Sequence, residues 1–333
     1  MPRTSAPAPP PPPPLPAGPP PASDAARAVS PPPVPPTLPP PPAPATAPAR
    51  GPLDDQLDAN AAAIRMLRAE LGAELPASWD DIWLLRYVLS FPDAGERVEA
   101  ARKSIKWRAE NAAMLADAAA GRPAPHYDAI RPYMVSGFHP PTNALHGEPL
   151  FIVRSGVSNP GAVMNMLPHA EVVKYLMFSR EESFLKCDAE TRKQRRLVKM
   201  ITMIHMEHAT ANVDRRFFMC LSESGKIAEF VYPQNLLKSV MFRPPSFFYT
   251  LFAFFRPLMT KKQLEKQAMC PGRAAGGIEA CPFAKHHFDV KTLPSIVGGE
   301  CTCDAAGGCI CGVSNALTKP NMAPGEKQRG WLW

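Results

Sequence analysis

An α/β layer fold is predicted by three features of this 333-residue sequence. Residues 198–206 form a near-continuous apolar run, as a strand buried on both faces of a parallel sheet requires. Residues 149–153 (Pro-Leu-Phe-Ile-Val) follow a turn at His146-Gly147-Glu148 and are typical of a second strand. Helical patterns alternate with these strand signals, and that alternation indicates the α/β class.

The first 52 residues differ from the rest in composition, because they hold 24 of the 43 prolines. Such a segment cannot bury enough apolar surface to offset its ordering entropy, so we expect residues 1–52 to be disordered. The proline runs could present polyproline II ligands to SH3 or WW modules, although a plain spacer is the favoured interpretation. The segment lacks the apolar core of a secretory signal.

Three helices are predicted next, over residues 54–71, 79–89 and 94–111, because apolar residues recur there at helical spacing. We expect them to form a small bundle within residues 53–120, ahead of a main domain over residues 121–300. The first helix carries its apolar face on Leu57, Ile64, Leu67 and Leu71.

The main domain opens with a strand predicted at residues 133–138, before the strand at 149–153. An amphipathic helix is predicted over residues 168–186, ahead of the buried strand at 198–206. Beyond that strand the pattern predicts a helix over 212–221, a short helix over 234–238 and a short strand over 239–242.

Residues 246–256 are predicted to form a helix with almost no polar face. Pro244-Pro245 and Pro257 bound it, since proline suits the start of a helix and prevents its continuation. A helix that is apolar all round must be buried or must touch lipid. This one is about half the roughly 20 residues needed to cross a bilayer. A core helix and a movable apolar wall over a cavity are therefore both open, and the flanking sequence favours the wall.

The formal net charge of +7 includes basic clusters at residues 192–196, 215–216 and 261–262. These clusters could meet phosphates of an anionic membrane surface, although solvated helix faces explain each cluster taken singly. Zinc-finger, RNP and helix-turn-helix signatures are absent from the sequence, which disfavours nucleic acid as a partner.

Eight cysteines without a secretory signal suggest a reducing, cytoplasmic compartment. Cys187 and Cys220 lie in apolar helical contexts and are expected in the core, whereas Cys270 and Cys281 bracket a Gly/Ala-rich loop. The tail over residues 301–333 carries four more, whose Cys-x-Cys spacing is tighter than the usual Cys-x-x-Cys of zinc sites. We therefore expect no cofactor and no metal, with zinc as the less favoured alternative at Cys301, Cys303, Cys309 and Cys311.

An enzyme would need a nucleophile–base pair or a metal site. His205 and Glu207 would share one face of a strand, with His208 on the other, which is poor geometry for one metal. A polar lining or a hydrogen-bonded structural role is favoured. The sequence shows no Gly-rich phosphate loop and no nucleophile elbow, so we expect a non-enzymatic protein.

Several stretches, in order, resemble the CRAL-TRIO lipid-binding family, and the resemblance covers about residues 53–311. The last of them is similar to the ending of the plant-type phosphatidylinositol/phosphatidylcholine transfer proteins. The stretches are Leu84-Leu85-Arg86-Tyr87 with Lys106-Trp107-Arg108; Gly147-Glu148-Pro149-Leu150-Phe151-Ile152 with Arg154 and Gly156; Tyr232-Pro233-Gln234-Asn235-Leu236; Phe242-Arg243-Pro244-Pro245-Ser246-Phe247-Phe248; Phe255-Arg256-Pro257-Leu258; and Leu293-Pro294 with Gly298-Gly299, Cys301 and Cys303.

The resemblance implies a mostly parallel sheet, flanked by helices, that floors an apolar lipid pocket closed by a mobile helix. It implies binding and transfer of a phospholipid, of the phosphatidylinositol or phosphatidylcholine class, by a peripheral protein at cytoplasmic membrane surfaces. The runner-up is a lipid-sensing adaptor that recruits partners through its Pro-rich tail. The pocket and gate residues would be Phe247, Phe248, Leu251, Phe252 and Phe255.

Glu223 and Arg256 match the family positions that hold the lipid headgroup, and Lys261 and Lys262 would lie beside the membrane. The sequence departs from the family pattern in four places, so a lipid pocket is better supported than recognition of inositol. A basic turn is shortened at residues 89–93, an acidic segment is replaced by residues 205–208, and an asparagine is replaced by Arg243. An insertion around residues 270–281 stands where the final strand is expected, between residues 266 and 293.

Overall fold

The computed structural model describes residues 50–139, 145–207, 209–210, 214–256, 264–270, 278 and 281–301. The chain divides into two units, Met1–Pro48 and Ala49–Trp333, and every described element belongs to the second. The predicted disorder of the Pro-rich tail and the chemistry of the last cysteines lie outside the described residues.

The N-terminal helices are α1 (Pro52–Ala59), α2 (Ala61–Leu71), α3 (Asp81–Ser90), α4 (Ala94–Glu110) and α5 (Ala112–Ala119). The helix predicted over residues 54–71 is interrupted at Asn60, whose side-chain amide donates to the Gln56 carbonyl at 2.8 Å. Asparagine competes with helix continuation in this way. Asp80 caps α3 by accepting from the Trp83 N–H at 3.0 Å, and Asp93 caps α4 in the same manner.

Two arginines tie these helices to α8 (His169–Gln194). The Arg86 guanidinium is fully buried, lies 3.2 Å from the Asp188 carboxylate and stacks over the Phe184 ring. Arg108 donates to both carboxylate oxygens of buried Glu181, at 3.0 and 2.9 Å. The N-terminal helices are therefore anchored to the main domain by buried ion pairs.

The sheet of the described residues has five strands in the order β1-β2-β3-β4-β5. Its strands are β1 (Ser136–Phe138), β2 (Leu150–Arg154), β3 (Met200–His205), β4 (Leu236–Phe242) and β5 (Gln267–Met269). β1 pairs antiparallel with β2, and the other three pairings are parallel, which confirms a mostly parallel sheet.

Two predictions about the sheet were wrong. Residues 234–238 are not a helix, because β4 already begins at Leu236 and pairs with β3. The final strand is not lost to the insertion, because β5 pairs in parallel with β4 before Cys270. The three residues of β5 are too few to give a periodic signal in the sequence.

Besides α8, the main domain has the helices α6 (Tyr127–Ile130), α7 (Pro160–Met166), α9 (Arg215–Val231), α10 (Ser246–Phe255) and α12 (Pro282–His287). Short 3-10 turns lie at Gly72–Glu74, Ser155–Val157, Val290–Thr292 and Ser295–Val297. α8 and α9 run well past their predicted ends. The last turns of α8 are polar, and pairs such as Arg192–Asp188, at 2.7 Å, support them in place of apolar packing.

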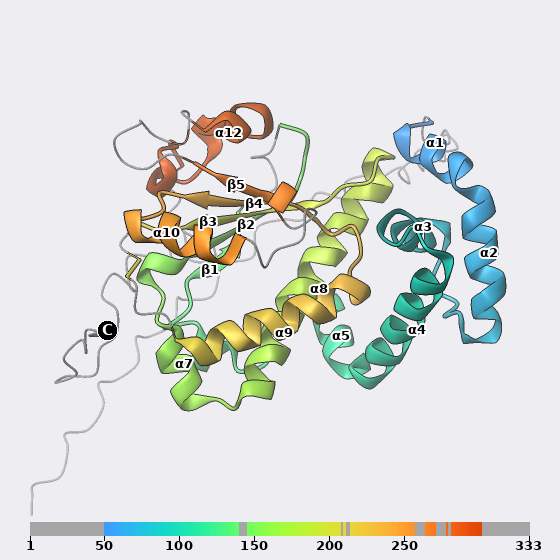
Figure 1. The fold of residues 1–333 in the computed structure, drawn as a ribbon, viewed down its shortest axis with the longest axis horizontal. Coiled ribbons are helices and arrows are strands. Elements are labelled where there is room, and N and C mark those ends of the chain that lie inside the picture. Colours follow the sequence, from blue (N-terminus) through green and yellow to red (C-terminus); the bar gives the residue numbers. More distant parts are fainter. Residues whose placement is uncertain are drawn as a thin grey trace, which may run out of the picture. The chain divides into compact units, whose positions relative to one another are not determined.

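One face of the sheet is fully packed. α12 lies on one side of the sheet and α8 and α9 on the other (Figure 1). On the α12 side, the sheet residues Leu150, Ile152, Ile201, Met203, Val240 and Phe242 form a buried cluster with Ala284, Phe288, Leu293 and Val297 of the C-terminal segment. This cluster is the main core of the sheet domain.

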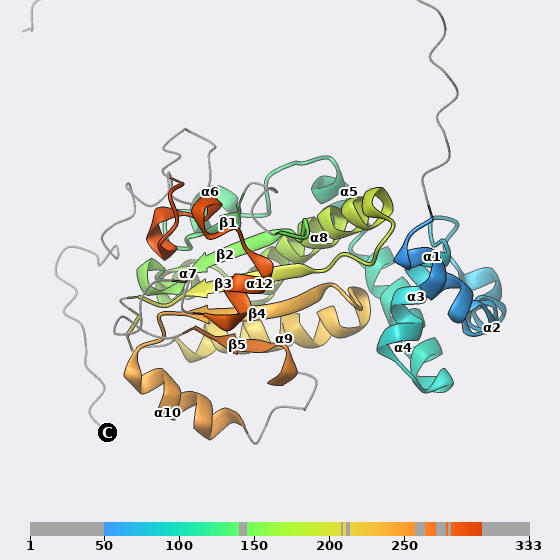
Figure 2. The same cartoon turned by 90° about the horizontal axis from the view of Figure 1, so that it is seen from above.

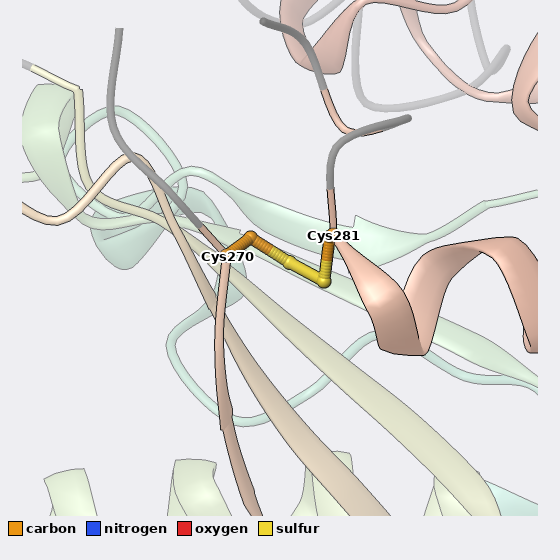
Figure 3. Close-up of a disulfide and its surroundings, with 2 residues drawn as sticks. All are labelled: Cys270 and Cys281. Carbon is orange, nitrogen blue, oxygen red and sulfur yellow. A yellow bond between two sulfur atoms is a disulfide. The ribbon is translucent and has the colours of Figure 1, made fainter. Parts of the chain in front are cut away.

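A disulfide joins Cys270, just after β5, to Cys281, just before α12 (Figure 3). Both cysteines are buried within the same cluster. The disulfide runs counter to the reducing compartment that the sequence suggested. Cys187 and Cys220 are buried and unpaired, as predicted.

Candidate functional site

The second face of the sheet carries apolar side chains that join none of the hydrophobic clusters of the described residues. The parallel pairings put Phe151 beside Thr202, Val153 beside Ile204, and Met241 beside Met269. Paired residues share a face, so these side chains point away from the packed α12 side. The members that stay partly exposed are Phe151, Val153, Thr202, Ile204 and Met269. A partly exposed, mostly apolar surface thus lies over β2, β3 and β5.

α8 presents polar side chains to this face. Tyr175, Ser179, Glu182 and Lys186 follow one another at helical spacing and share one side of the helix. The Lys186 ammonium lies 4.9 Å from the centre of the Phe138 ring, which in turn meets Phe151 edge-on at 5.0 Å. A lining that is apolar on the sheet and polar on α8 suits an amphipathic ligand.

Burial shifts the pKa values of two side chains in this row on α8, those of Tyr175 and Glu182. It raises the pKa of Tyr175 to about 12, opposed by a hydrogen bond to Ser136 of β1. It also raises the pKa of Glu182, while the charge of Lys186 acts in the opposite direction. Sequence reasoning missed these residues, although polar side chains on one side of an amphipathic helix were a visible signal.

The Phe-rich helix α10 lies alongside the sheet, beyond the β5 edge (Figure 2). Phe247, Phe248 and Phe252 are half-buried, and the rings of Phe248 and Phe252 stack 6.1 Å apart. Tyr249 is 44% exposed. The side chains of Leu251 and Phe255 lie outside the description. None of the α10 side chains that the structure describes is fully buried, which is unlike a core helix and consistent with a movable wall.

α10 starts directly after the carboxyl end of β4. Arg243 occupies the connection in a left-handed conformation, with φ of 52°, and is followed by Pro244 and Pro245. The Arg243 guanidinium donates to the Glu207 carboxylate at 2.8 Å. The helix is therefore attached through a short, conformationally restricted segment.

A polar cluster occupies the carboxyl ends of β2, β3 and β4. Arg154, His205 and Phe242 are neighbours in register, and the ring of His205 stacks on that of Phe242. His205 is 4% exposed, and burial, followed by the charge of Arg154, lowers its pKa to about 4. Its Nε2 lies 3.4 Å from Glu207, as expected of residues predicted to share a face. His208 is outside the described residues.

The two predicted headgroup residues are placed on different helices. Glu223 of α9 accepts a hydrogen bond from His169 Nε2 at 2.7 Å, and the other ring nitrogen of His169 lies 3.2 Å from Cys220 Sγ. Burial raises the pKa of Cys220, so this Cys–His–Glu chain holds a neutral thiol, not a nucleophilic thiolate. Arg256 is exposed at the end of α10. The headgroup role of this pair stays a prediction.

The other predicted sites fall mostly outside the description. Lys261, Lys262, Cys303, Cys309 and Cys311 are not described, and Cys301 is half-buried. In the part of the chain that is described, no three His, Cys, Asp or Glu side chains are grouped so as to hold a metal. Nor is any described helix both long and apolar enough to cross a membrane.

Comparison with known proteins gives a family match and a structural likeness. Residues 143–299 match the family model of the CRAL/TRIO domain. Among solved structures, the chain is similar to the crystal structure of Sfh5, with a TM-score of 0.47 and 13% sequence identity. That likeness covers 65% of this chain and 79% of the other.

Proposed function

Residues 143–299 place this chain in the CRAL-TRIO lipid-binding family, and from that premise we propose that it binds one phospholipid and transfers it between membranes. The observation that carries the proposal is the half-exposed apolar face of β2, β3 and β5, which faces polar α8 side chains and is flanked by α10. The acyl chains would lie on the sheet face, and α10 would be the wall that moves.

The energetics require such a wall. Two acyl chains of about 16 carbons hold a phospholipid in a bilayer by on the order of 25 kcal/mol, at about 0.8 kcal/mol per methylene. A carrier must offer comparable apolar surface and must open it at the membrane. An apolar helix attached at one end through Arg243-Pro244-Pro245 can supply both the surface and the opening.

The test replaces one half-buried phenylalanine of the wall. Phe252→Asp should abolish transfer of labelled phospholipid between vesicles, because a charge on the ligand side of α10 is costly to bury. Thr250→Asp, on an exposed position of the same helix, is the matched control and should keep transfer. If the Phe252→Asp variant folds and still transfers phospholipid at the rate of the parent protein, the proposal is wrong. Mass spectrometry of lipid that co-purifies with the protein would name the lipid class.

Arg256 is proposed to contact the headgroup phosphate, since it is charged and exposed where α10 ends. A charge-assisted hydrogen bond of this kind contributes roughly 1.5–3 kcal/mol. Arg256→Ala should therefore weaken phospholipid binding at least several-fold while sparing an uncharged ligand such as a sterol. An equal loss for both ligands would mean that Arg256 is structural.

The adaptor alternative depends on the Pro-rich segment. Removing residues 1–48, which form a unit of their own, should leave lipid transfer intact if transfer is the function. If the shortened protein no longer binds SH3 or WW modules but transfers lipid as the full chain does, the two activities belong to separate parts of the chain. Loss of transfer itself would contradict the assignment of transfer to the folded unit.

A further inference from the structure

We propose that Arg180 and the apolar side chains around it, where α8 meets α9, bind a long-chain fatty acid whose carboxylate is held by the Arg180 guanidinium. Both helices lie on the side of the sheet opposite α12 (Figure 1). Arg180 Nη2 donates to the hydroxyl of buried Ser224 of α9 at 3.2 Å, so the guanidinium reaches across the contact of the two helices. This ligand differs from the phospholipid of the proposed function, whose phosphate is assigned to Arg256.

Arg180 is a cation without a counter-ion among the described residues. Burial lowers its pKa, but a guanidinium stays charged in proteins. The ionisable group that acts on it is Tyr232, and burial raises the pKa of this phenol, so Tyr232 is neutral and does not balance the charge. Neighbouring carboxylates are bound elsewhere, since Glu181 accepts from Arg108 through both oxygens and Glu223 accepts from a histidine. A largely buried charge is costly unless paired, so an anion would stabilise this arrangement.

The hydrogen bonding of Arg180 is also incomplete. Its Nε is buried and has no acceptor in the part of the chain that the structure describes. Of its five N–H groups, one is bonded to the Ser224 hydroxyl. That hydroxyl donates to the Leu221 carbonyl at 3.0 Å, and therefore does not need the arginine. The two oxygens of a carboxylate could accept from Nε and a neighbouring Nη together, which is the geometry that a guanidinium fork favours.

The surroundings of Arg180 suit an acyl chain. Leu176 lies one turn before Arg180 on α8. Leu221 and Ala228 lie about one turn before and after Ser224 on α9. All three leucine and alanine side chains pack against the hydrophobic cluster of these helices and stay partly exposed, and Arg180 itself keeps some accessible surface. Accessible apolar side chains around one unbalanced cation match an amphiphile with a single negative charge and no larger polar group, which describes a fatty acid.

Calorimetry of the full chain with palmitate and with hexadecanol tests the proposal, because the two ligands share a chain length and differ in the charge of the head group. The test variant is Arg180→Met, which removes the charge and keeps an unbranched side chain. This change leaves no carboxylate unpaired, so the fold should tolerate it. Lys174→Met is the matched control, because it removes a charge from an exposed position of the same helix.

We expect the parent protein to bind palmitate at least about ten-fold more tightly than hexadecanol, because only palmitate offers a charged acceptor. Arg180→Met should weaken palmitate binding at least about ten-fold and leave hexadecanol binding unchanged, and Lys174→Met should affect neither. Unchanged palmitate binding in Arg180→Met overturns the proposal. An equal loss of both ligands also overturns it, because Arg180 would then only support the packing of α8 on α9. Loss of phosphatidylcholine transfer in place of palmitate binding overturns it as well, because the anion would be a lipid phosphate.

Stability gives a second readout. Because Arg180 lacks a counter-ion, Arg180→Met should leave the free energy of unfolding of the delipidated protein unchanged or raise it. Saturating palmitate should raise the urea midpoint of the parent and of Lys174→Met more than that of Arg180→Met. If Arg180→Met fails to fold, the parent alone decides, since equal affinity for palmitate and hexadecanol overturns the proposal. Phospholipid transfer is measured separately and should survive Arg180→Met, so a failure of this site is distinct from a failure of lipid transfer.

Discussion

At the scale of single residues, buried histidines such as His139 and His205 contribute to how the stability of the protein responds to mild acid. Burial lowers the pKa of each to about 4, below the ordinary 6.5. The unfolded chain therefore takes up protons before the folded chain does, and the free energy of unfolding should fall as pH drops from about 6.5 towards 5. The slope is at most about 1.4 kcal/mol per pH unit for each histidine. Urea unfolding between these pH values measures it, and a flat profile would contradict the burial of both rings.

The Arg108–Glu181 pair makes a second prediction at this scale. Glu181 is 2% exposed, so Arg108→Ala would leave its carboxylate buried without its cation. We expect a loss of about 3–5 kcal/mol in the free energy of unfolding. Replacing both residues, as Arg108→Met with Glu181→Leu, should recover much of this loss. The control is Lys106→Ala, in an exposed pair of the same helix, which should change stability by less than about 1 kcal/mol. A double variant as unstable as Arg108→Ala would show that packing, not charge, accounts for the loss.

At the scale of elements, the disulfide between Cys270 and Cys281 ties the edge strand β5 to α12. It closes a loop over a sequence separation of 11 residues, and such a loop contributes about 3 kcal/mol by limiting the unfolded chain. A Cys270→Ala, Cys281→Ala double variant should lose about 2–4 kcal/mol, and reductant should destabilise only the parent protein. Urea unfolding with and without reductant measures both. If reductant leaves the parent unchanged, the two thiols are not joined in solution.

Elements with strong apolar periodicity could be predicted from the sequence, and the others could not. The buried run that became β3, the amphipathic start of α8 and the Phe-rich α10 were found because side-chain burial sets their pattern. The polar end of α8 was missed because ion pairs support it, and the first residues of β4, 236–238, were wrongly predicted to be helical. Their strand conformation is instead imposed by pairing with β3.

The same limit applies to the candidate site. Phe247, Phe248 and Phe252 could be predicted as wall residues because their apolar character is visible in one short run, and their role stays a prediction. The union of Arg154, His205 and Arg243 could not, since nothing in the sequence shows that strand ends about 50 and 90 residues apart share one edge. Only the strand order brings these residues together.

At the scale of the whole molecule, exposed apolar side chains occur beside cations where α7 and α9 meet. Met166, Phe218 and Met219 are each between 44% and 56% exposed. Arg216 donates to Asn165 at 2.8 Å and so holds the start of α9 against the end of α7. Apolar side chains next to basic residues suit an anionic membrane surface.

The last prediction is that membrane binding is both apolar and electrostatic. Each basic residue near an anionic surface contributes about 1 kcal/mol, screened over about 10 Å at 0.1 M salt. Vesicle binding should therefore rise with anionic lipid content and fall when salt reaches about 0.5 M. Lys261→Glu with Lys262→Glu should lower vesicle binding as high salt does.

Phe218→Ser with Met219→Ser should weaken vesicle binding at every salt concentration. Met66→Ser is the control, because Met66 is 61% exposed on α2, within the N-terminal helices. If vesicle binding does not change with salt or with anionic lipid content, the basic residues belong to an ordinary solvated surface. The apolar side chains alone would then attach the protein to membranes.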